Sequence, residues 1–190
     1  RRRFGLSAEV LISASQYWCE NGDAELAMNA GLAVRVLYPE NAMVSLVCGQ
    51  AAIKLGDVSA AQQYATHSRR TTSLKSPFHF DPTAHDVALA LLEVKIESNL
   101  GNAGRQREIM NMLSSRHPGN AHVEKLRLRV LMELGDAKIV LTDGLKHMKI
   151  HGASASVLVL CADAADALGL RDKASAWRQL ATGASSSSSE

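Results

Sequence analysis

The chain of 190 residues is 46% hydrophobic and 21% charged, a composition that predicts a folded domain with a sizeable core and argues against a disordered chain. Its 21 basic and 19 acidic residues give a formal net charge of +2, too small to indicate nucleic acid or an acidic membrane surface as a general partner. Aromatic residues make up only 4%, which favours helices over sheets.

Regularly spaced glycines divide the chain into predicted helices. The glycines are Gly22, Gly56, Gly101, Gly135 and Gly169, and a leucine directly precedes all of them except Gly22. Three of the intervals between them are equal, and the interval from Gly56 to Gly101 is longer. Pro39 and Pro118 follow Gly22 and Gly101 at half of the common interval. A repeat period of about 34 residues, which the equal intervals match, is typical of proteins built from stacked helix-turn-helix units.

The residues around these breaks predict how one helix ends and the next begins. A glycine after an apolar run takes the left-handed conformation that ends a helix, and a proline cannot continue one. An Asp or Asn that follows accepts hydrogen bonds from the first backbone amides of the next helix. The predicted N-cap residues are Asp23, Asn41, Asp57, Asn102, Asn120 and Asp136.

Together the breaks predict an all-α protein, an α-α superhelix (solenoid) of about five helix-turn-helix units. The predicted helix pairs span residues 6–37, 41–70, 84–116, 120–149 and 153–182. Residues 1–5 are expected to be an N-terminal fragment or linker before the solenoid of residues 6–182, and residues 183–190 a disordered serine-rich tail. The longer glycine interval places an insertion at residues 71–83.

The insertion contains Phe78 and Phe80, whose alternation predicts an extended stretch with both rings on one side. We expect the rings to dock on the protein's own helices, because exposed aromatic rings reduce solubility. The alternative is that the rings await a partner.

The pattern resembles the tetratricopeptide repeat (TPR) family over about residues 6–182. The resemblance rests on the equal glycine spacing, the LGD turns, the prolines at unit ends and small residues within the helices. Those small residues are Ala27, Ala61 and Ala174, each at the same distance after a turn glycine, and Gly49. The resemblance implies a concave surface, lined by the first helix of each pair, that binds a peptide or a helix of a partner protein.

The third and fourth predicted helix pairs depart from this pattern. Gln106 and Val140 replace the small residue after the turn. Glu93 and Arg127 occupy a position that holds alanine or cysteine in the other units. Because Glu93 and Arg127 share one position in consecutive units, they either pair across the stack or are separately exposed.

A binding groove is predicted on the first helices, where positions 13, 10, 6 and 3 before the turn glycine share one helical stripe. The predicted groove residues are Gln16, Leu46, Gln50, Ile53, Leu91, Lys95, His122, Lys125, Arg129 and Met132. The cations among them predict a protein partner with an acidic or amphipathic segment. The alternative is that these cations are merely solvated. Towards the C-terminus the stripe becomes acidic, at Asp163 and Asp166.

Two motifs contain histidines at spacings that occur in metal sites. HMKIH places His147 and His151 one turn apart on a helix, but Met148 stands where a zinc protease has its glutamate. We interpret the pair as two solvated histidines near a helix end. HFDPTAHD, residues 79–86, either holds a cation or forms a loop and caps the next helix, and we favour the loop and cap.

No catalytic motif is present: the chain has no G-x-S-x-G, no G-x-G-x-x-G, no phosphate-binding loop and no C-x-x-C. We therefore expect no enzyme, no cofactor and no metal site. Cys48 and Cys161 lie on apolar helix faces and are predicted to be small core residues rather than nucleophiles.

The cysteine content favours a reducing compartment. Three widely spaced cysteines predict no disulfide framework, so we expect a cytoplasmic location. No apolar run approaches the roughly 20 residues of a membrane-spanning helix, and no signal peptide is recognised. The opening RRRFGLSAEV lacks a methionine, so we expect it to follow an upstream segment. Its arginines also fit the cytoplasmic part of a membrane-associated protein.

These observations favour a protein–protein interaction scaffold, adaptor or chaperone. An alternative is an architectural subunit of a larger assembly, such as a bacterial secretion or envelope complex. Helical-repeat RNA binding uses similar helix pairs and reads one base per repeat. It is less favoured here, because the charge is close to neutral and the glycine spacing keeps strictly to the TPR period.

Overall fold

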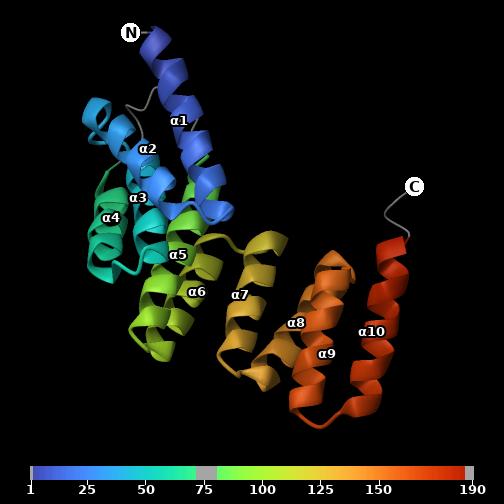
Figure 1. The fold of residues 1–190 in the computed structure, drawn as a ribbon. Helices are drawn as coiled ribbons and strands as arrows, with labels where there is room; N and C mark the ends of the chain where they lie inside the picture. Colours follow the sequence, from blue (N-terminus) through green and yellow to red (C-terminus); the bar gives the residue numbers. More distant parts are fainter. Residues whose placement is uncertain (1, 72–80, 187–190) are drawn as a thin grey trace. The chain divides into compact units, whose positions relative to one another are not determined.

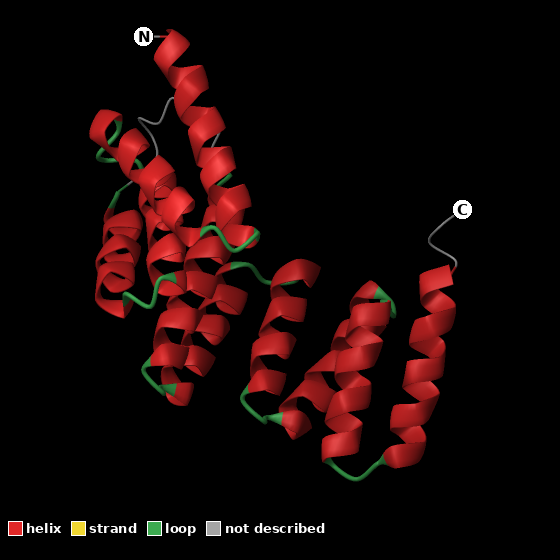
Figure 2. Ribbon diagram, viewed as in Figure 1, coloured by secondary structure: helices red, strands yellow, loops and turns green. Residues whose placement is uncertain are grey.

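The computed structural model describes residues 2–71 and 81–186, and within these ranges the regular elements are all helices (Figures 1 and 2). In chain order they are α1 (Arg2–Glu20), α2 (Ala24–Leu37), α3 (Ala42–Lys54), α4 (Val58–Arg70), α5 (Pro82–Asn99), α6 (Ala103–Arg116), α7 (Ala121–Glu133), α8 (Ala137–His151), α9 (Ala155–Ala167) and α10 (Arg171–Ser186). Successive helices of the described ranges form five pairs, each joined at one of the predicted glycines. The predicted all-α helical-repeat architecture is confirmed.

The ends of the chain are more helical than expected. Helix α1 begins at Arg2, so residues 2–5 belong to a helix rather than to a linker. Helix α10 continues to Ser186, which lies within the predicted disordered tail. The expectation for Phe78 and Phe80 falls on residues 72–80, which lie outside the described residues.

The turn within each pair is the predicted glycine-terminated helix end. Gly56 and Gly135 have φ angles of 80° and 79°, in the left-handed region that favours glycine. At the first of these turns the Asp57 amide donates to the Ala52 carbonyl over 2.9 Å, and the Gly56 amide donates to the Ile53 carbonyl over 3.3 Å. This is the pair of hydrogen bonds of a Schellman motif, which satisfies carbonyls at the end of a helix.

Asparagine caps begin the first helices of two pairs. The Asn41 side chain accepts hydrogen bonds from the amides of Met43 and Val44 at the start of α3. Asn120 accepts from two amides in the same way at the start of α7. Asp57 caps α4, whereas Asp23 stands at the expected position before α2 without a capping bond from its side chain. These local bonds set where each helix begins.

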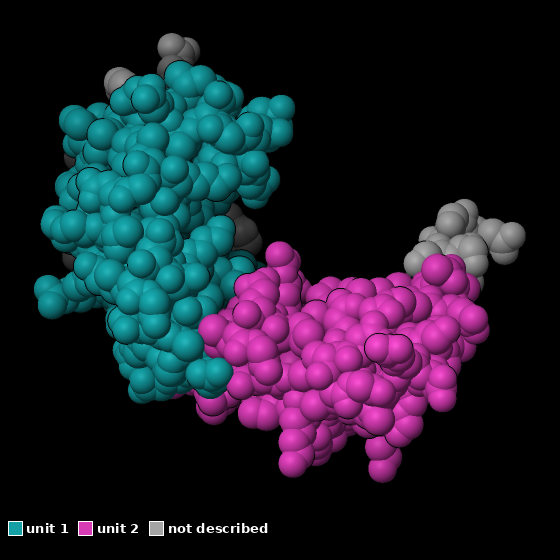
Figure 3. All heavy atoms as spheres, turned by 60° about the horizontal axis from the view of Figure 1, so that its bottom comes forward, with its two compact units in different colours: residues 1–109 teal, residues 110–190 magenta. Residues whose placement is uncertain are grey.

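The chain divides into two compact units, residues 1–109 and residues 110–190 (Figure 3). In unit 1, α3 contacts α1, α2, α4 and α5, and residues 44–49 of α3 are all buried. In unit 2, α7, α8 and α9 contact one another and α10 packs on α9. Each unit therefore builds its core from the apolar faces of consecutive helices.

Small residues allow neighbouring pairs to approach closely within each unit. Gly31 on α2 faces Cys48 on α3, and Gly144 on α8 faces Cys161 on α9. A Cβ atom added at these glycines would lie 2.7 Å and 2.5 Å from the facing sulfur atoms. The same glycine–cysteine contact thus recurs between the second helix of one pair and the first helix of the next. This close contact explains why α3 and α9 have a small residue, Cys48 and Cys161, at the same position of the repeat.

Candidate functional site

The predicted groove residues of unit 1 differ widely in exposure. Leu46 is 1% exposed and packs with Ala61 and Leu92, so its assignment to a groove surface was wrong. Ile53 packs against the same core cluster and is only partly buried. Lys95 is exposed. The remaining predicted members, Gln16, Gln50 and Leu91, are partly buried.

Unit 2 contains an open cavity of about 740 Å³ among α7, α9 and α10. Two predicted groove residues, Lys125 and Arg129, line it. The other lining residues are Leu126, Ala155, Ser156, Val159, Leu160, Arg178, Ala181 and Thr182. Most of these side chains are apolar or small, and the charged groups among them are all cations. The other two predicted residues of unit 2, exposed His122 and partly buried Met132, do not line this cavity.

The three cations at the cavity differ in how far protein groups neutralise them. Arg178 donates to Asp163 over 2.9 Å and forms an ion pair with Asp166 at 2.6 Å, and these hydrogen bonds raise the pKa of its guanidinium. Arg129 pairs with Glu133 at 3.2 Å, on an exposed helix face. The predicted acidic end of the stripe is therefore neutralised by Arg178.

Lys125 differs from the two arginines. Its side chain is partly buried at the cavity and makes no ion pair with any residue in the described ranges. A lysine ammonium at the edge of an apolar surface attracts an anionic group more strongly than a fully solvated one, because less water screens it. Lys125 is thus the available cation of the cavity.

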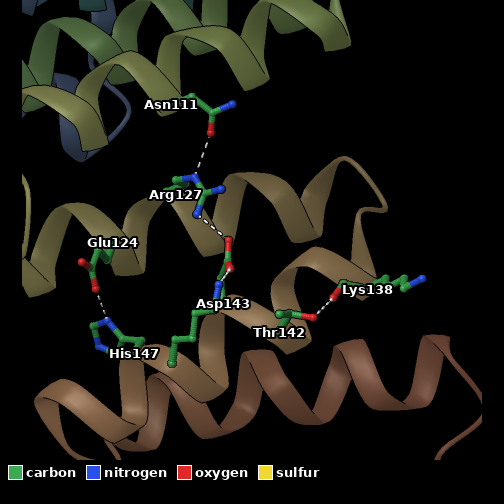
Figure 4. A network of polar contacts seen from close by, with 8 residues as sticks. Asn111, Glu124, Arg127, Lys138, Thr142, Asp143 and His147 are labelled. Carbon is green, nitrogen blue, oxygen red and sulfur yellow. Dashed lines mark hydrogen bonds and ion pairs between the residues drawn. The ribbon is translucent and has the colours of Figure 1, made fainter.

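Arg127 forms the centre of a polar network that joins α6, α7 and α8 within unit 2 (Figure 4). Its guanidinium donates to Asp143 and to Asn111, both over 2.9 Å. Asp143 also pairs with Lys146 at 3.5 Å. Glu93 instead pairs with Arg69 in unit 1. Each of the two residues therefore has an ion pair within its own unit, and their pairing across the stack stays one of the two alternatives that the sequence left open.

The prediction of two solvated HMKIH histidines near a helix end was wrong for His147, whereas His151 is exposed and ends α8. His147 is only 6% exposed, and its Nδ1 atom lies 2.9 Å from a carboxylate oxygen of Glu124 on α7 (Figure 4). The Nε2 atom of His151 lies 3.3 Å from the same oxygen. The three side chains form the one group of potential metal ligands found among the described residues.

A signal for these contacts was present in the sequence. Glu124 and His147 lie at nearly equal distances along the chain from the turn glycine Gly135, one before it and one after it. Arg127 and Asp143 lie at equal distances from the same glycine. Residues at equal distances from a tight turn between two antiparallel helices lie side by side. Counting outward from each turn glycine would have found both pairs.

The second histidine motif behaves as the favoured loop-and-cap interpretation predicted, in the part that is described. Asp81 accepts hydrogen bonds from the amides of Thr83 and Ala84 and caps α5. His85 is buried, and its Nε2 atom lies 2.9 Å from the Ser68 hydroxyl. Burial lowers the pKa of His85, because a charged imidazolium is poorly solvated there.

Cys48 and Cys161 are core residues, as predicted, and Cys19 is buried as well. Cys19, Cys48 and Cys161 are free and buried. Desolvation raises the pKa of Cys48 and of Cys161 to about 11, which makes both poor nucleophiles near neutral pH. Among the helices of the described ranges, none is both long enough and apolar enough to cross a membrane.

Comparison with solved structures identifies the architecture. A tetratricopeptide repeat protein from Parabacteroides merdae ATCC 43184 superimposes with a TM-score of 0.69 over 93% of this chain, at 19% sequence identity. The chain has the TPR fold. TTC0263, a TPR protein of Thermus thermophilus, gives a TM-score of 0.63 at 14% identity, covering 93% of this chain and 91% of its own. A crystal structure of MamA gives 0.62 at 14% identity, covering 92% and 95%.

These similarities define the fold and no more, because all three identities are low. The chain spans 65% of the length of the P. merdae protein. No protein-family model matches the chain, and no curated protein matches it significantly. Within the TPR fold, α7 and α9 are the first helices of their pairs, and both line the cavity of unit 2.

Proposed function

We propose that this chain is a non-catalytic interaction scaffold whose unit 2 binds an acidic, amphipathic helical segment of a partner protein. The observation that carries the proposal is the cavity among α7, α9 and α10, with its apolar floor and its cationic edge. Its volume of about 740 Å³ falls within the range of roughly 300–1,000 Å³ typical of ligand pockets. Such a cavity has room for a few apolar side chains of a bound segment.

The apolar part of the cavity supplies the hydrophobic contact. Val159 is 42% exposed, and it lines the cavity with Leu126, Leu160 and Ala181. Burying apolar surface stabilises a complex by about 25 cal/mol per Å² removed from water. Apolar residues spaced i, i+3 and i+4 on one face of a partner helix would meet these side chains.

The charge of the cavity determines the chemistry of the partner. Lys125 has no ion pair among the described residues, and the Arg129–Glu133 pair is exposed enough to rearrange at little cost. A carboxylate beside the apolar face of the segment would pair with Lys125 and gain a charge-assisted hydrogen bond. Complementary charge of this kind gives specificity and a faster encounter more than it gives affinity.

The experiment selects peptides from a displayed random library on the immobilised chain and measures the affinity of the best synthetic peptide by fluorescence anisotropy. We expect apolar residues at helical spacing together with Asp or Glu. Lys125→Glu and Val159→Glu should each weaken binding about tenfold or more. The matched control Lys173→Glu makes the same charge change at an exposed lysine of α10 outside the cavity, and it should leave the affinity unchanged.

Two results would contradict the proposal: selected peptides without acidic residues, or equal binding to Lys125→Glu and to the parent chain.

The architectural alternative is favoured by Val36 on α2, an apolar side chain that is 83% exposed. If the cavity variants keep all binding while Val36→Glu releases native neighbours, the chain is an architectural subunit instead. The prediction that a groove in unit 1 is lined by Gln16, Gln50, Leu91 and Lys95 remains a prediction.

We also propose the cellular compartment in which the chain works. Three buried free thiols are typical of proteins in a reducing environment, so we propose a cytoplasmic location. Fractionation of the native cell with an antibody to the chain tests it. Recovery from an oxidising compartment would contradict it.

A further inference from the structure

We propose that Glu124, His147 and His151 form a binding site for a divalent transition metal ion, with zinc as the ion that fits best. The ligand atoms come from both helices of one pair, the carboxylate from α7 and the two imidazoles from α8. They all lie within 4.8 Å of one another. Figure 4 shows the side chains of Glu124 and His147 turned towards each other.

The two distances from the Glu124 oxygen to the imidazole nitrogens are close to those of a zinc centre. Zinc bonds of about 2.0–2.1 Å to nitrogen and oxygen in a tetrahedron separate neighbouring ligand atoms by about 3.3 Å. The Glu124 oxygen lies 2.9 Å from the Nδ1 atom of His147 and 3.3 Å from the Nε2 atom of His151. Small side-chain rotations would therefore bring the three atoms to the corners of one tetrahedron.

The site is built into the packing rather than formed by chance on the surface. His147 is buried, so the surrounding helices hold its ring in place. The two rings are neighbours, with centroids 4.7 Å apart. The side chains of His151 and Glu124 are 21% and 26% exposed, which leaves a path for an ion and room for a water molecule as fourth ligand.

Electrostatics favours a cation at this place. Helix α8 ends at His151, and the unsatisfied carbonyls of a helix C-terminus carry a partial negative charge. The Glu124 carboxylate accepts a hydrogen bond from the Nδ1 atom of His147, and the Nε2 atom of His151 lies 3.3 Å from the same oxygen. On binding, each neutral ring would carry its proton on the other nitrogen, and the metal would take the place between the three ligand atoms.

The donor set selects the class of metal. Two imidazole nitrogens and one carboxylate oxygen suit zinc and its first-row neighbours, whereas calcium and magnesium prefer oxygen ligands throughout. Because Glu124 lies near the start of α7 and His151 ends α8, a bound ion would join the two helices at the end of the pair remote from Gly135.

The test titrates the tag-free full chain with zinc sulfate, using isothermal titration calorimetry and competition with a chromophoric chelator. We expect one zinc ion per chain. His151→Ala and Glu124→Gln should each weaken binding at least about tenfold. The matched control His122→Ala removes an exposed histidine of α7 that lies outside the group, and it should bind as the parent does.

Thermal denaturation separates a lost ligand from a lost fold. Without zinc, His151→Ala should melt close to the parent, because its side chain is partly solvated. With zinc, the parent and His122→Ala should melt at a higher temperature while His151→Ala does not respond, since an ion that binds only the native state stabilises it. Zinc binding that is absent in the parent, or unchanged in both His151→Ala and Glu124→Gln, would overturn the proposal.

Discussion

Replacing Gly144 by alanine tests the close approach of α8 and α9. A methyl group at this position would lie 2.5 Å from the sulfur of Cys161, a distance that real Cβ atoms do not show, and 4.0 Å from Leu128. Cys161 is fully buried among the apolar residues of the unit 2 core. Because Cys161 is buried, either its side chain must rotate within the packed core or the two helices must separate.

The size of the effect follows from two opposing contributions. Overpacking a well-packed core costs about 1–3 kcal/mol. Alanine in place of glycine within a helix contributes up to about 1 kcal/mol of stability, through propensity. The 2.5 Å contact places the cost in the upper part of that range, about 2–3 kcal/mol. After the gain is subtracted, the variant should lose about 1–2 kcal/mol, and its melting temperature should fall by about 2–8 °C for a chain of this size.

Circular dichroism measures the effect during thermal and urea denaturation. Gly104→Ala is the matched control, because a Cβ at this helical glycine of α6 meets no atom within 4 Å and should leave stability unchanged or slightly higher. Gly144→Ala combined with Cys161→Ala should lose less than the two single variants added together. If Gly144→Ala is as stable as the parent, the glycine–cysteine contact does not limit the packing of these helices.

Three further predictions concern the core and the turns. The pKa of His85 is lowered in the folded protein, so the unfolded chain, with a His pKa of about 6.5, takes up a proton more readily. The contribution of neutral His85 to the free energy of unfolding is therefore complete above about pH 6.5 and decreases as the pH falls below that value. Acid should lower the melting temperature of the parent more than that of His85→Gln. Cys48 and Cys161, with pKa values of about 11, should react with a thiol reagent at pH 8 far more slowly in the native protein than in denaturant. Gly135→Val should cost more than about 1 kcal/mol, because the φ angle of 79° is unfavourable for a β-branched residue, and a melting temperature equal to that of the parent would contradict this.

The contrast between Asn41 and Leu46, which lie close together in the sequence, separates what could be predicted from what could not. The cap formed by Asn41 depends on the amides of Met43 and Val44, so the local sequence contains everything that the bond requires. The burial of Leu46 depends on α4 and α5, whose residues pack over it from elsewhere in the chain. A helical stripe has the same period whether it faces a groove or a neighbouring helix.

The partners of charged side chains show the same limit. The spacing of His147 and His151 is visible in the sequence, but their carboxylate, Glu124, comes from another helix. Arg127 likewise pairs with Asp143, which comes from the next helix across a turn. Electrostatic attraction falls with distance, so the nearest opposite charge in space determines the pair.

The sequence by itself determined the helices, their glycine turns and their period, because these depend on backbone conformation and on hydrogen bonds between residues close together in the chain. The tertiary structure alone decided which face of each helix is covered, which cations are neutralised and where a cavity stays open. At the cavity of unit 2, Lys125 and Arg129 were predicted from their helical positions, whereas Val159, Leu160 and Arg178 come from helices whose approach the period does not specify. Packing distances between helices depend on the side chains of both partners, and no single stripe of residues contains that information.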